Sequence, residues 1–282
     1  MVNLQGKVCL VTGATSGIGR ATALGLAQMG ATVALVARDR ARGEATRNEI
    51  IAQSGNSAIE LLLADLSSQQ SIRQLAGSIA QNYPRLHVLV NNAGLFNLRR
   101  HTTVDGLELT FAVNYLAPFL LTNLLLDTLK ASAPARIVNV SSDSHEAGYI
   151  RLDRLQSDRG YRPMRAYGQS KLALVLFTYE LARRLEGSGV TVNALHPGFV
   201  STNIAQSGIG PIGRAAARLI FLRGITPEEG AKTSIYLASS PEVEGVTGKY
   251  FVKSIPRRSV EVSYDEALQR RLWEESVKLV GL

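Results

Sequence analysis

The chain has 282 residues, of which 45% are hydrophobic and 19% charged, and its formal net charge is +8. This composition supports a large buried core and excludes a disordered chain. Its lysines and arginines are scattered, which argues against a nucleic-acid partner, and its single cysteine, Cys9, excludes an intrachain disulfide and a cysteine metal cluster.

The N-terminus and the apolar runs predict a cytoplasmic protein. The first residues lack the basic start and apolar stretch of a signal peptide. No apolar run reaches the ~18 residues of a membrane span. Cys9 lies inside an apolar run, which indicates a buried thiol and fits a reducing compartment. We therefore expect a cytoplasmic chain with no stable membrane anchor and no metal site.

Short apolar strands alternate with helices along the whole chain. The predicted strands cover residues 7–12, 32–37, 57–64, 86–91, 135–141, 190–195 and 248–252. The predicted helices cover residues 20–29, 40–53, 68–82, 105–131, 165–186, 226–238 and 264–279. Strands that are apolar on both faces and joined by helices form parallel sheets covered on both sides. We predict an α/β fold: one doubly wound Rossmann-type domain over residues 1–282, with about seven parallel strands and helices on both faces.

A glycine-rich turn joins the first strand to the first helix. It reads Thr-Gly-Ala-Thr-Ser-Gly-Ile-Gly over residues 12–19. Glycines let the backbone approach a pyrophosphate, and a helix N-terminus offers free N–H groups and a partial positive charge. The turn therefore predicts dinucleotide binding. The residues expected to border the cofactor here are Gly13, Thr15, Ser16, Gly17, Ile18 and Gly19.

The spacing Thr-Gly-x-x-x-Gly-x-Gly resembles the short-chain dehydrogenase/reductase family, and the resemblance covers nearly the whole chain. It implies cofactor contacts after further strands: an adenine contact at residues 64–66, the Asn-Asn-Ala-Gly segment 91–94 beside the adenosine ribose, and a Pro-Gly turn against the nicotinamide. For the two asparagines, turn chemistry is the alternative. The residues that match the family's cofactor positions are Asp65, Leu66, Asn92, Ala93, Gly94, Pro197, Gly198, Val200 and Thr202.

The end of the second strand bears on the choice of cofactor. An acidic residue there would bind a ribose 2′-hydroxyl and repel a 2′-phosphate. Here Arg38 comes first, and a guanidinium can hold the 2′-phosphate. We therefore expect NADP(H). Asp39, one residue on, keeps NAD(H) as the alternative.

Tyr167 and Lys171 form a Tyr-x-x-x-Lys pair on one face of a predicted helix. A free phenol has a pKa of about 10, and a nearby ammonium is expected to lower it. Tyr167 would then exchange a proton with a carbonyl or alcohol oxygen, as its family counterpart does. Lys171 can also reach the nicotinamide ribose, so both residues are expected to border the cofactor as well.

Two further residues complete the catalytic set that the resemblance implies. Ser142, the second serine after the fifth strand, matches the family serine that would polarise the substrate oxygen. Asn114 matches an asparagine that holds a water able to pass protons to the lysine. Pro118 lacks an N–H, so the carbonyl of Asn114 loses its normal helix partner. We expect Asn114 and Pro118 to form this water site, and His145 and His196 to be structural.

The resemblance is strongest to retinol dehydrogenase-like and WW-domain-oxidoreductase-like members. It rests on the 24 residues between Ser142 and Tyr167, a Phe-Leu-Leu-Thr run at 119–122 and Arg-Arg-Leu-Trp at 270–273. Residues 143–166 are expected to form a substrate loop. The apolar segment 199–224 is expected to form a lid, with weak membrane contact as the alternative.

These features favour a small hydrophobic substrate: a retinoid or an aliphatic or aromatic aldehyde or ketone. The alternatives are a steroid- or polyketide-type carbonyl reductase and, more remotely, a non-catalytic dinucleotide sensor. The resemblance also implies a homo-oligomer, a dimer or tetramer, with contacts through helices 105–131 and 165–186.

Overall fold

The computed structural model describes residues 3–156, 160–199 and 224–282. Its strands form one sheet in the order β3-β2-β1-β4-β5-β6-β7-β8, and every neighbouring pair is parallel except β7 with β8. The strands are β1 Val8–Thr12, β2 Thr32–Ala37, β3 Ile59–Leu63, β4 Val88–Asn91, β5 Ala135–Val140, β6 Val190–His196, β7 Tyr250–Val252 and β8 Ile255–Arg257. The predicted doubly wound α/β fold is confirmed.

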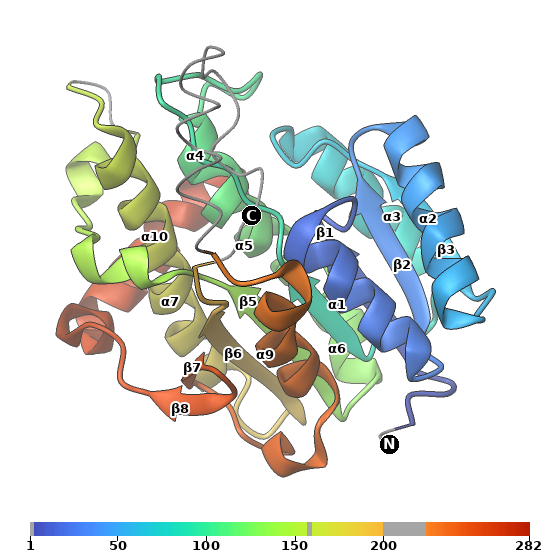
Figure 1. Cartoon of the computed structure of the whole chain (residues 1–282). Helices are drawn as coiled ribbons and strands as arrows, with labels where there is room; N and C mark the ends of the chain where they lie inside the picture. The colour runs from blue at the N-terminus through green and yellow to red at the C-terminus, as the bar shows by residue number, and fades with distance from the viewer. Residues whose placement is uncertain (1–2, 157–159, 200–223) are drawn as a thin grey trace.

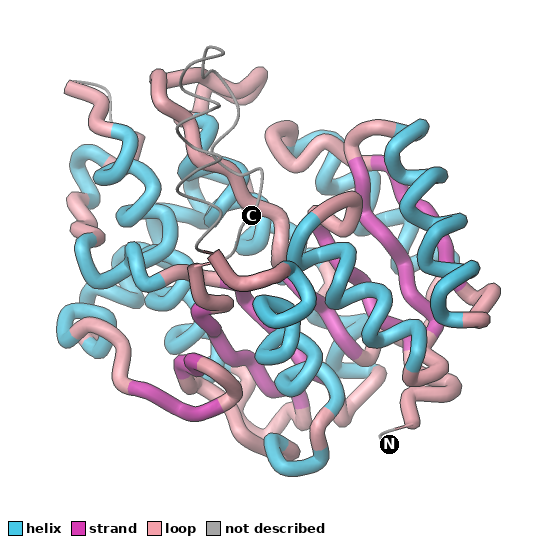
Figure 2. Tube along the Cα trace, in the orientation of Figure 1, coloured by secondary structure: helices cyan, strands magenta, loops and turns pink. Residues whose placement is uncertain are grey.

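Helices cover both faces of this sheet (Figures 1 and 2). The α-helices are α1 Gly17–Gln28, α2 Arg40–Ser54, α3 Gln69–Asn82, α4 Leu109–Phe111, α5 Ala117–Leu124, α6 Leu126–Ala131, α7 Pro163–Arg184, α9 Pro227–Ser239 and α10 Glu266–Val280. One apolar cluster contains side chains from α3, α5, α7 and α10. The other contains side chains from α1, α2 and α9. The strands are apolar on both faces because successive side chains alternate: Leu10 joins the first cluster, Cys9 and Val11 the second.

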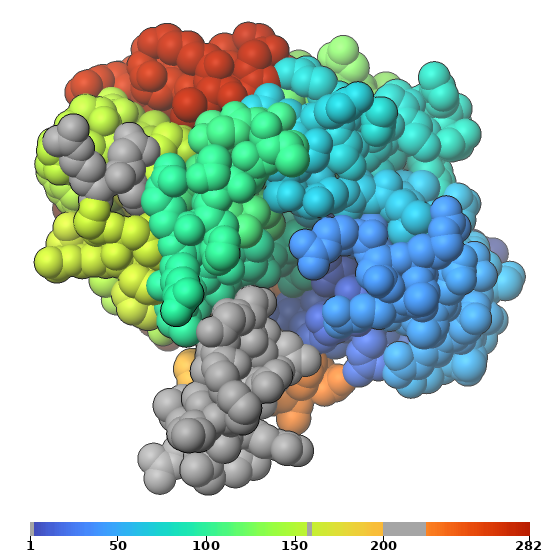
Figure 3. Space-filling model, turned by 90° about the horizontal axis from the view of Figure 1, so that it is seen from above, coloured from blue at the N-terminus to red at the C-terminus, as the bar shows by residue number. Residues whose placement is uncertain are grey.

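The strand order places the site. Along the chain the order reverses around β1, which pairs with β2 on one side and β4 on the other. Ligands of open parallel sheets bind beyond the carboxyl ends of the strands at such a point. The loops that carry the predicted motifs follow the carboxyl ends of β1, β2, β3, β4, β5 and β6. From above, the green segment after β4 forms a ridge between the yellow-green segment before α7 and the blue N-terminal part (Figure 3).

Two predicted elements are corrected. The single helix predicted over residues 105–131 begins at Leu109 and is interrupted by a π-helical stretch, η1, at Ala112–Leu116. The Ala117 N–H there bonds to the Ala112 carbonyl, five residues back. Pro118 cannot supply the usual partner of the Asn114 carbonyl, which is a local cause for the altered hydrogen bonding. The short antiparallel strand β8 was not predicted.

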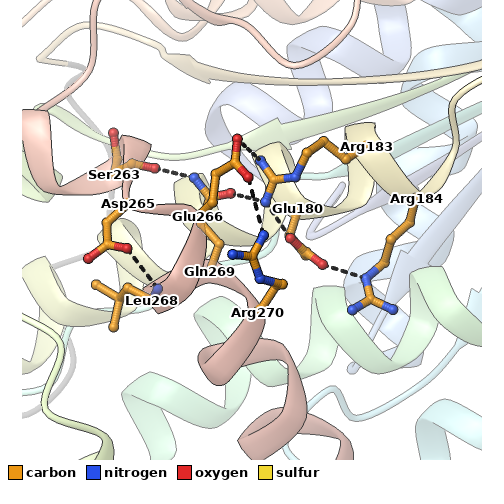
Figure 4. Close-up of polar contacts among 9 residues, drawn as sticks. All are labelled: Glu180, Arg183, Arg184, Ser263, Asp265, Glu266, Leu268, Gln269 and Arg270. Carbon is orange, nitrogen blue, oxygen red and sulfur yellow. Dashed lines mark hydrogen bonds and ion pairs between the residues drawn. The ribbon is translucent and has the colours of Figure 1, made fainter.

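Helix α10 is fixed on α7 by an aromatic cluster and by a polar network, which Figure 4 shows. Trp273 packs on Phe119 and Phe177, with ring centroids 4.9 and 5.7 Å away. Glu180 of α7 binds Arg183 and Arg184, and Arg183 also donates to Gln269 of α10. Helix α10 thus covers part of the surface through which we expected a homo-oligomer, and that assembly stays a prediction.

Candidate active site

The glycine-rich turn leaves the N-terminus of α1 open to an anion. Its N-cap, Ser16, is extended, makes no side-chain capping bond and is followed by no acidic residue in the first turn. Gly13 and Gly17 have φ values of 64° and 54°, which favour glycine. A Cβ at Gly19 would lie 2.3 Å from the Gly13 carbonyl oxygen. This uncapped, tightly turned helix start fits a dinucleotide pyrophosphate.

Asn92 and Ala93 brace this turn from the end of β4. The Asn92 side chain donates to the carbonyls of Thr12 and Gly13, at 2.9 and 3.3 Å. The backbone N–H groups of Asn92 and Ala93 both donate to the Thr12 hydroxyl at 3.0 Å. The side chain of Asn91 donates to Asn139 of the neighbouring strand β5 and to Thr122 of helix α5. Both asparagines therefore have the structural role we had kept as an alternative, and Asn92 does so at the cofactor turn.

The second strand ends with one free cation and one occupied carboxylate. Asp39 is the N-cap of α2, and its Oδ1 accepts the Arg42 N–H at 2.8 Å. Arg38 is exposed, and within the described residues its guanidinium makes no hydrogen bond or ion pair. After β3, Asp65 Oδ1 accepts from the N–H and hydroxyl of Ser67, while Leu66 packs partly into the core. One carboxylate oxygen of Asp65 is thus used by its own turn.

The end of β5 and the first turns of α7 bring Ser142, Tyr167 and Lys171 together. The Lys171 Nζ lies 5.6 Å from the centre of the Tyr167 ring. A hydrogen bond with Ser142 lowers the pKa of the Tyr167 phenol, although burial outweighs it. Ser141, in contrast, is buried and donates to the Lys171 carbonyl at 2.9 Å. The structure therefore places the second serine, and not the first, beside the tyrosine.

Burial shifts the pKa values of the tyrosine and lysine in opposite directions. It lowers the pKa of Lys171 to about 8. The ammonium is 3% exposed and donates to the Val140 carbonyl at 2.9 Å. Burial, with a smaller contribution from the nearby charge of Asp143, raises the pKa of Tyr167 to about 12. Our prediction that Lys171 lowers this pKa is wrong, because the free-energy cost of burying the phenolate exceeds the stabilisation that neighbouring groups provide.

Asn114 is fully buried, and its side-chain amide binds Leu95 and Ser170. Its Oδ1 accepts the Leu95 N–H at 2.8 Å, and its Nδ2 donates to the Leu95 carbonyl at 2.9 Å and to Ser170 Oγ at 3.0 Å. A Cβ at Gly94 would lie 3.4 Å from both Asn114 Oδ1 and Lys171 Nζ, so glycine permits this close approach. The amide clamps the loop after β4 beside the lysine, and the water site that we predicted would have to use the Asn114 backbone.

Both active-site histidines hold backbone groups. Buried His145 bonds through Nδ1 to the Ser142 carbonyl at 2.7 Å, and its Nε2 accepts the Val260 N–H at 3.3 Å. His196 Nδ1 accepts the Asp143 N–H at 3.1 Å. Burial lowers the pKa of each imidazole. These contacts agree with the structural roles that we expected.

Pro197 and Gly198 follow β6 at the same edge, and Gly198 has a φ of 92°. A Cβ there would come within 2.7 Å of Ile225. Val200, Thr202 and most of the expected lid 199–224 lie outside the described residues, as do residues 157–159 of the expected substrate loop. Phe96 was not predicted: its ring packs edge-on to Tyr167 at 5.6 Å. The only signal for it was an aromatic residue two positions after Gly94.

The described residues contain neither a membrane-spanning helix nor a metal-binding cluster. No helix among them is long and apolar enough to cross a membrane. They also contain no group of three or more His, Cys, Asp or Glu side chains arranged to hold a metal ion.

Comparisons with known proteins agree on one family. The short chain dehydrogenase family model matches residues 7–209. The chain is 45% identical to retinol dehydrogenase 14 of Homo sapiens, over 99% of this chain and 88% of that protein. It is 43% identical to polyprenol dehydrogenase of Homo sapiens, over 98% and 86%. A crystal structure of an uncharacterised protein from Mycobacterium paratuberculosis superposes with a TM-score of 0.81 at 32% identity, covering 100% of this chain and 96% of that one.

Proposed function

Because this chain belongs to the short-chain dehydrogenase/reductase family, we propose that it transfers a hydride between NADP(H) and the alcohol or carbonyl group of a hydrophobic substrate. It is an oxidoreductase of that family, related to retinol dehydrogenases, and the family uses NAD(P)(H). The observation that carries the proposal is the meeting of Ser142, Tyr167 and Lys171 where β5 and α7 adjoin.

Each of these side chains has a chemical task. When bound, the nicotinamide would supply or accept the hydride. Tyr167, protonated at neutral pH because burial raises its pKa, donates its proton to a carbonyl oxygen during reduction and takes one back during oxidation. Lys171, fixed by the Val140 carbonyl, supplies positive charge beside the phenol as it loses its proton. Ser142 orients the substrate oxygen.

Proton supply to Lys171 involves the π-helical stretch. We propose that the Asn114 carbonyl, which Pro118 cannot satisfy, holds a water that returns protons to the lysine. The Asn114 side chain contributes indirectly by clamping Leu95. Asn114 is therefore a positioning residue through its amide and a proton-path residue through its backbone.

Arg38 and Asp39 support NADP(H) over NAD(H). The Asp39 carboxylate is engaged as the cap of α2, whereas the Arg38 guanidinium is available to a 2′-phosphate. The glycine-rich turn and Asp65, Leu66, Asn92, Ala93, Gly94, Pro197, Gly198, Val200 and Thr202 would border the remainder of the cofactor.

A hydrophobic substrate is supported by the loops at the carboxyl edge. Large apolar side chains there are exposed by 43–86%: Leu98, Val104, Tyr149, Met164 and Phe199. Exposed apolar groups around a site favour apolar ligands. The names of the relatives, a retinol dehydrogenase and a polyprenol dehydrogenase, point to long isoprenoid alcohols and their aldehydes. A steroid or polyketide carbonyl remains the second candidate.

A substrate panel with both cofactors tests the proposal. The protein would be incubated with NADPH or NADH and with all-trans-retinal, decanal, benzaldehyde, a 17-ketosteroid or an acetoacetyl thioester, and product would be separated by chromatography. We expect NADPH-dependent reduction of the long apolar aldehydes. NADPH binding without turnover of any compound would favour the non-catalytic sensor, and preferred reduction of the steroid or thioester would favour the second candidate.

A further inference from the structure

The Ser142 hydroxyl has no hydrogen-bonding capacity left for a carbonyl substrate. A serine hydroxyl offers one proton and two lone pairs. Ser142 Oγ accepts the Ser144 N–H at 3.2 Å and interacts with the Tyr167 phenol. It lies 2.9 Å from Asp143 Oδ1, which as a carboxylate oxygen can only accept. The single proton of Ser142 is therefore directed at Asp143.

Among the described residues, the competing acceptors for this proton are Ser144 Oγ and the neutral Tyr167 phenol, and both are weaker. Ser144 Oγ lies 3.3 Å from Ser142 Oγ and carries no charge. A charge-assisted hydrogen bond is shorter and about twice as strong as a neutral one, so the carboxylate at 2.9 Å prevails. While Asp143 holds its proton, Ser142 accepts the proton of the neutral Tyr167 phenol; the Ser142 hydroxyl lowers the pKa of Tyr167 because the same proton can turn to the phenolate.

Asp143 is itself held from β6. Its N–H donates to His196 Nδ1 at 3.1 Å, and its Oδ2 lies 3.8 Å from His196 Nε2. The carboxylate is exposed, with 65% of its side chain accessible, so it can release the serine without a buried charge being stranded. This contact can therefore be exchanged during binding.

We propose that Asp143 is a specificity-determining residue, an inference that rests on the proposed function. Asp143 competes with a carbonyl substrate for the only proton of the Ser142 hydroxyl. A carbonyl oxygen can only accept, so it gains the serine hydrogen bond only by taking the proton from Asp143. An alcohol can donate its own proton to the Ser142 lone pair that Tyr167 vacates, and it leaves the Asp143 bond intact. Asp143 thus favours alcohols over carbonyl compounds in the binding step.

Two unreactive ligands with the same nonyl chain separate these cases. N,N-dimethyldecanamide only accepts hydrogen bonds and resists hydride reduction, whereas 2-methyl-2-undecanol can donate and cannot be oxidised. Their Kd values would be measured by calorimetry on the protein with bound NADPH, for the wild type, Asp143→Ala, Asp143→Asn and Glu146→Gln. Glu146 is an exposed carboxylate on the same turn and serves as the matched control for charge.

We expect Asp143→Ala to bind the amide about 3- to 10-fold more tightly, the gain of one hydrogen bond, with less than a twofold change for the alcohol. Asp143→Asn should show a smaller gain, and Glu146→Gln none. Equal changes for both ligands, no change, or the same selectivity shift in Glu146→Gln would overturn the proposal. Wild-type turnover of decanal tests the proposed function separately, because the ligand affinities require no catalysis.

Discussion

Tyr167 and Lys171 are each kept in their uncharged form more readily by burial than they would be in water. Burial lowers the pKa of Lys171 to about 8 and raises that of Tyr167 to about 12. With these pKa values, Tyr167 is a neutral phenol and Lys171 is mostly a charged ammonium at neutral pH. The cation at Lys171 then matters most when the phenol loses that proton, which is the moment when charge develops.

The burial of Lys171 predicts a pH-dependent stability. Between pH 8 and 10 the unfolded chain keeps a proton on this amine that the folded chain has lost, so stability from this residue rises with pH and is lowest below pH 8. At about 1.4 kcal/mol per unit, the rise is about 2–3 kcal/mol. Urea unfolding of the wild type and Lys171→Met at pH 7 and 10 should show it as a difference between the two proteins. A parallel pH dependence in both would contradict the burial argument.

Arg38 carries the cofactor preference. Replacing it with alanine removes a charge-assisted contact to the 2′-phosphate, and the KM for NADPH should rise about 10- to 100-fold, while that for NADH stays within about twofold. Arg40→Ala is the matched control, because Arg40 faces Glu44 on α2 at 3.6 Å and should matter less. Equal losses for NADPH and NADH in Arg38→Ala would show that Arg38 does not read the phosphate.

At the residue scale, the sequence predicts where the site residues lie better than it predicts which groups they contact. Tyr167 and Lys171 could be paired because they lie one helical turn apart, and Ser142, which follows a strand, was assigned through the family resemblance. The Val140 carbonyl that holds Lys171 has no side-chain signal, since any residue supplies a carbonyl. The predicted direction of the Tyr167 pKa shift was wrong, because residue spacing shows which groups lie near the phenol but not how far burial removes it from water.

At the scale of elements, α7 joins the site to the C-terminal helix. Its first turns carry Tyr167 and Lys171, and its last turns carry Glu180, only 4% exposed, between Arg183 and Arg184. Arg184 also lies over the Trp273 ring, 4.2 Å from its centre. The position of α7 therefore depends on α10 as well as on the sheet.

Replacing Glu180 with glutamine should lower the free energy of unfolding by about 1–3 kcal/mol, because it removes the charge that two arginines share in a buried setting. Both arginines are 37–44% exposed, which keeps the loss below that of a fully buried pair. Glu275→Gln, which breaks the exposed pair with Lys278 on α10, should leave the free energy of unfolding almost unchanged, because water screens this pair. Equal losses in urea unfolding would contradict this account of the network.

Most elements could be predicted from periodicity, and the exceptions have physical causes. The helix predicted over 105–131 is largely apolar from residue 111 to residue 121, so its pattern could not mark the π-helical stretch at Ala112–Leu116; only Pro118 hinted at it. The strand β8, Ile255–Arg257, is three residues long, exposed and contains a proline, so alternation gives no signal. Its existence depends on pairing with β7.

At the scale of the whole molecule, the candidate site lies at the carboxyl edge of the sheet and is built from loops that follow six strands, β1 to β6. A ligand that bridges these loops should stabilise the native state alone. NADPH at about 100 times its Kd should raise the free energy of unfolding by about 2.7 kcal/mol, visible as a higher Tm. NADH at the same concentration should give a smaller rise. An unchanged Tm with NADPH would argue against a cofactor site at this edge.

The central claim is that Tyr167 moves the proton that accompanies hydride transfer. Tyr167→Phe removes one oxygen and keeps the ring that packs against Phe96. The direct measurement is kcat for NADPH-dependent reduction of a long apolar aldehyde by the wild type and by this variant, alongside the Kd for NADPH. We predict a loss in kcat of about 10²–10⁴-fold with NADPH affinity within about twofold. A variant that retains kcat within a few-fold of the wild type would contradict the assignment.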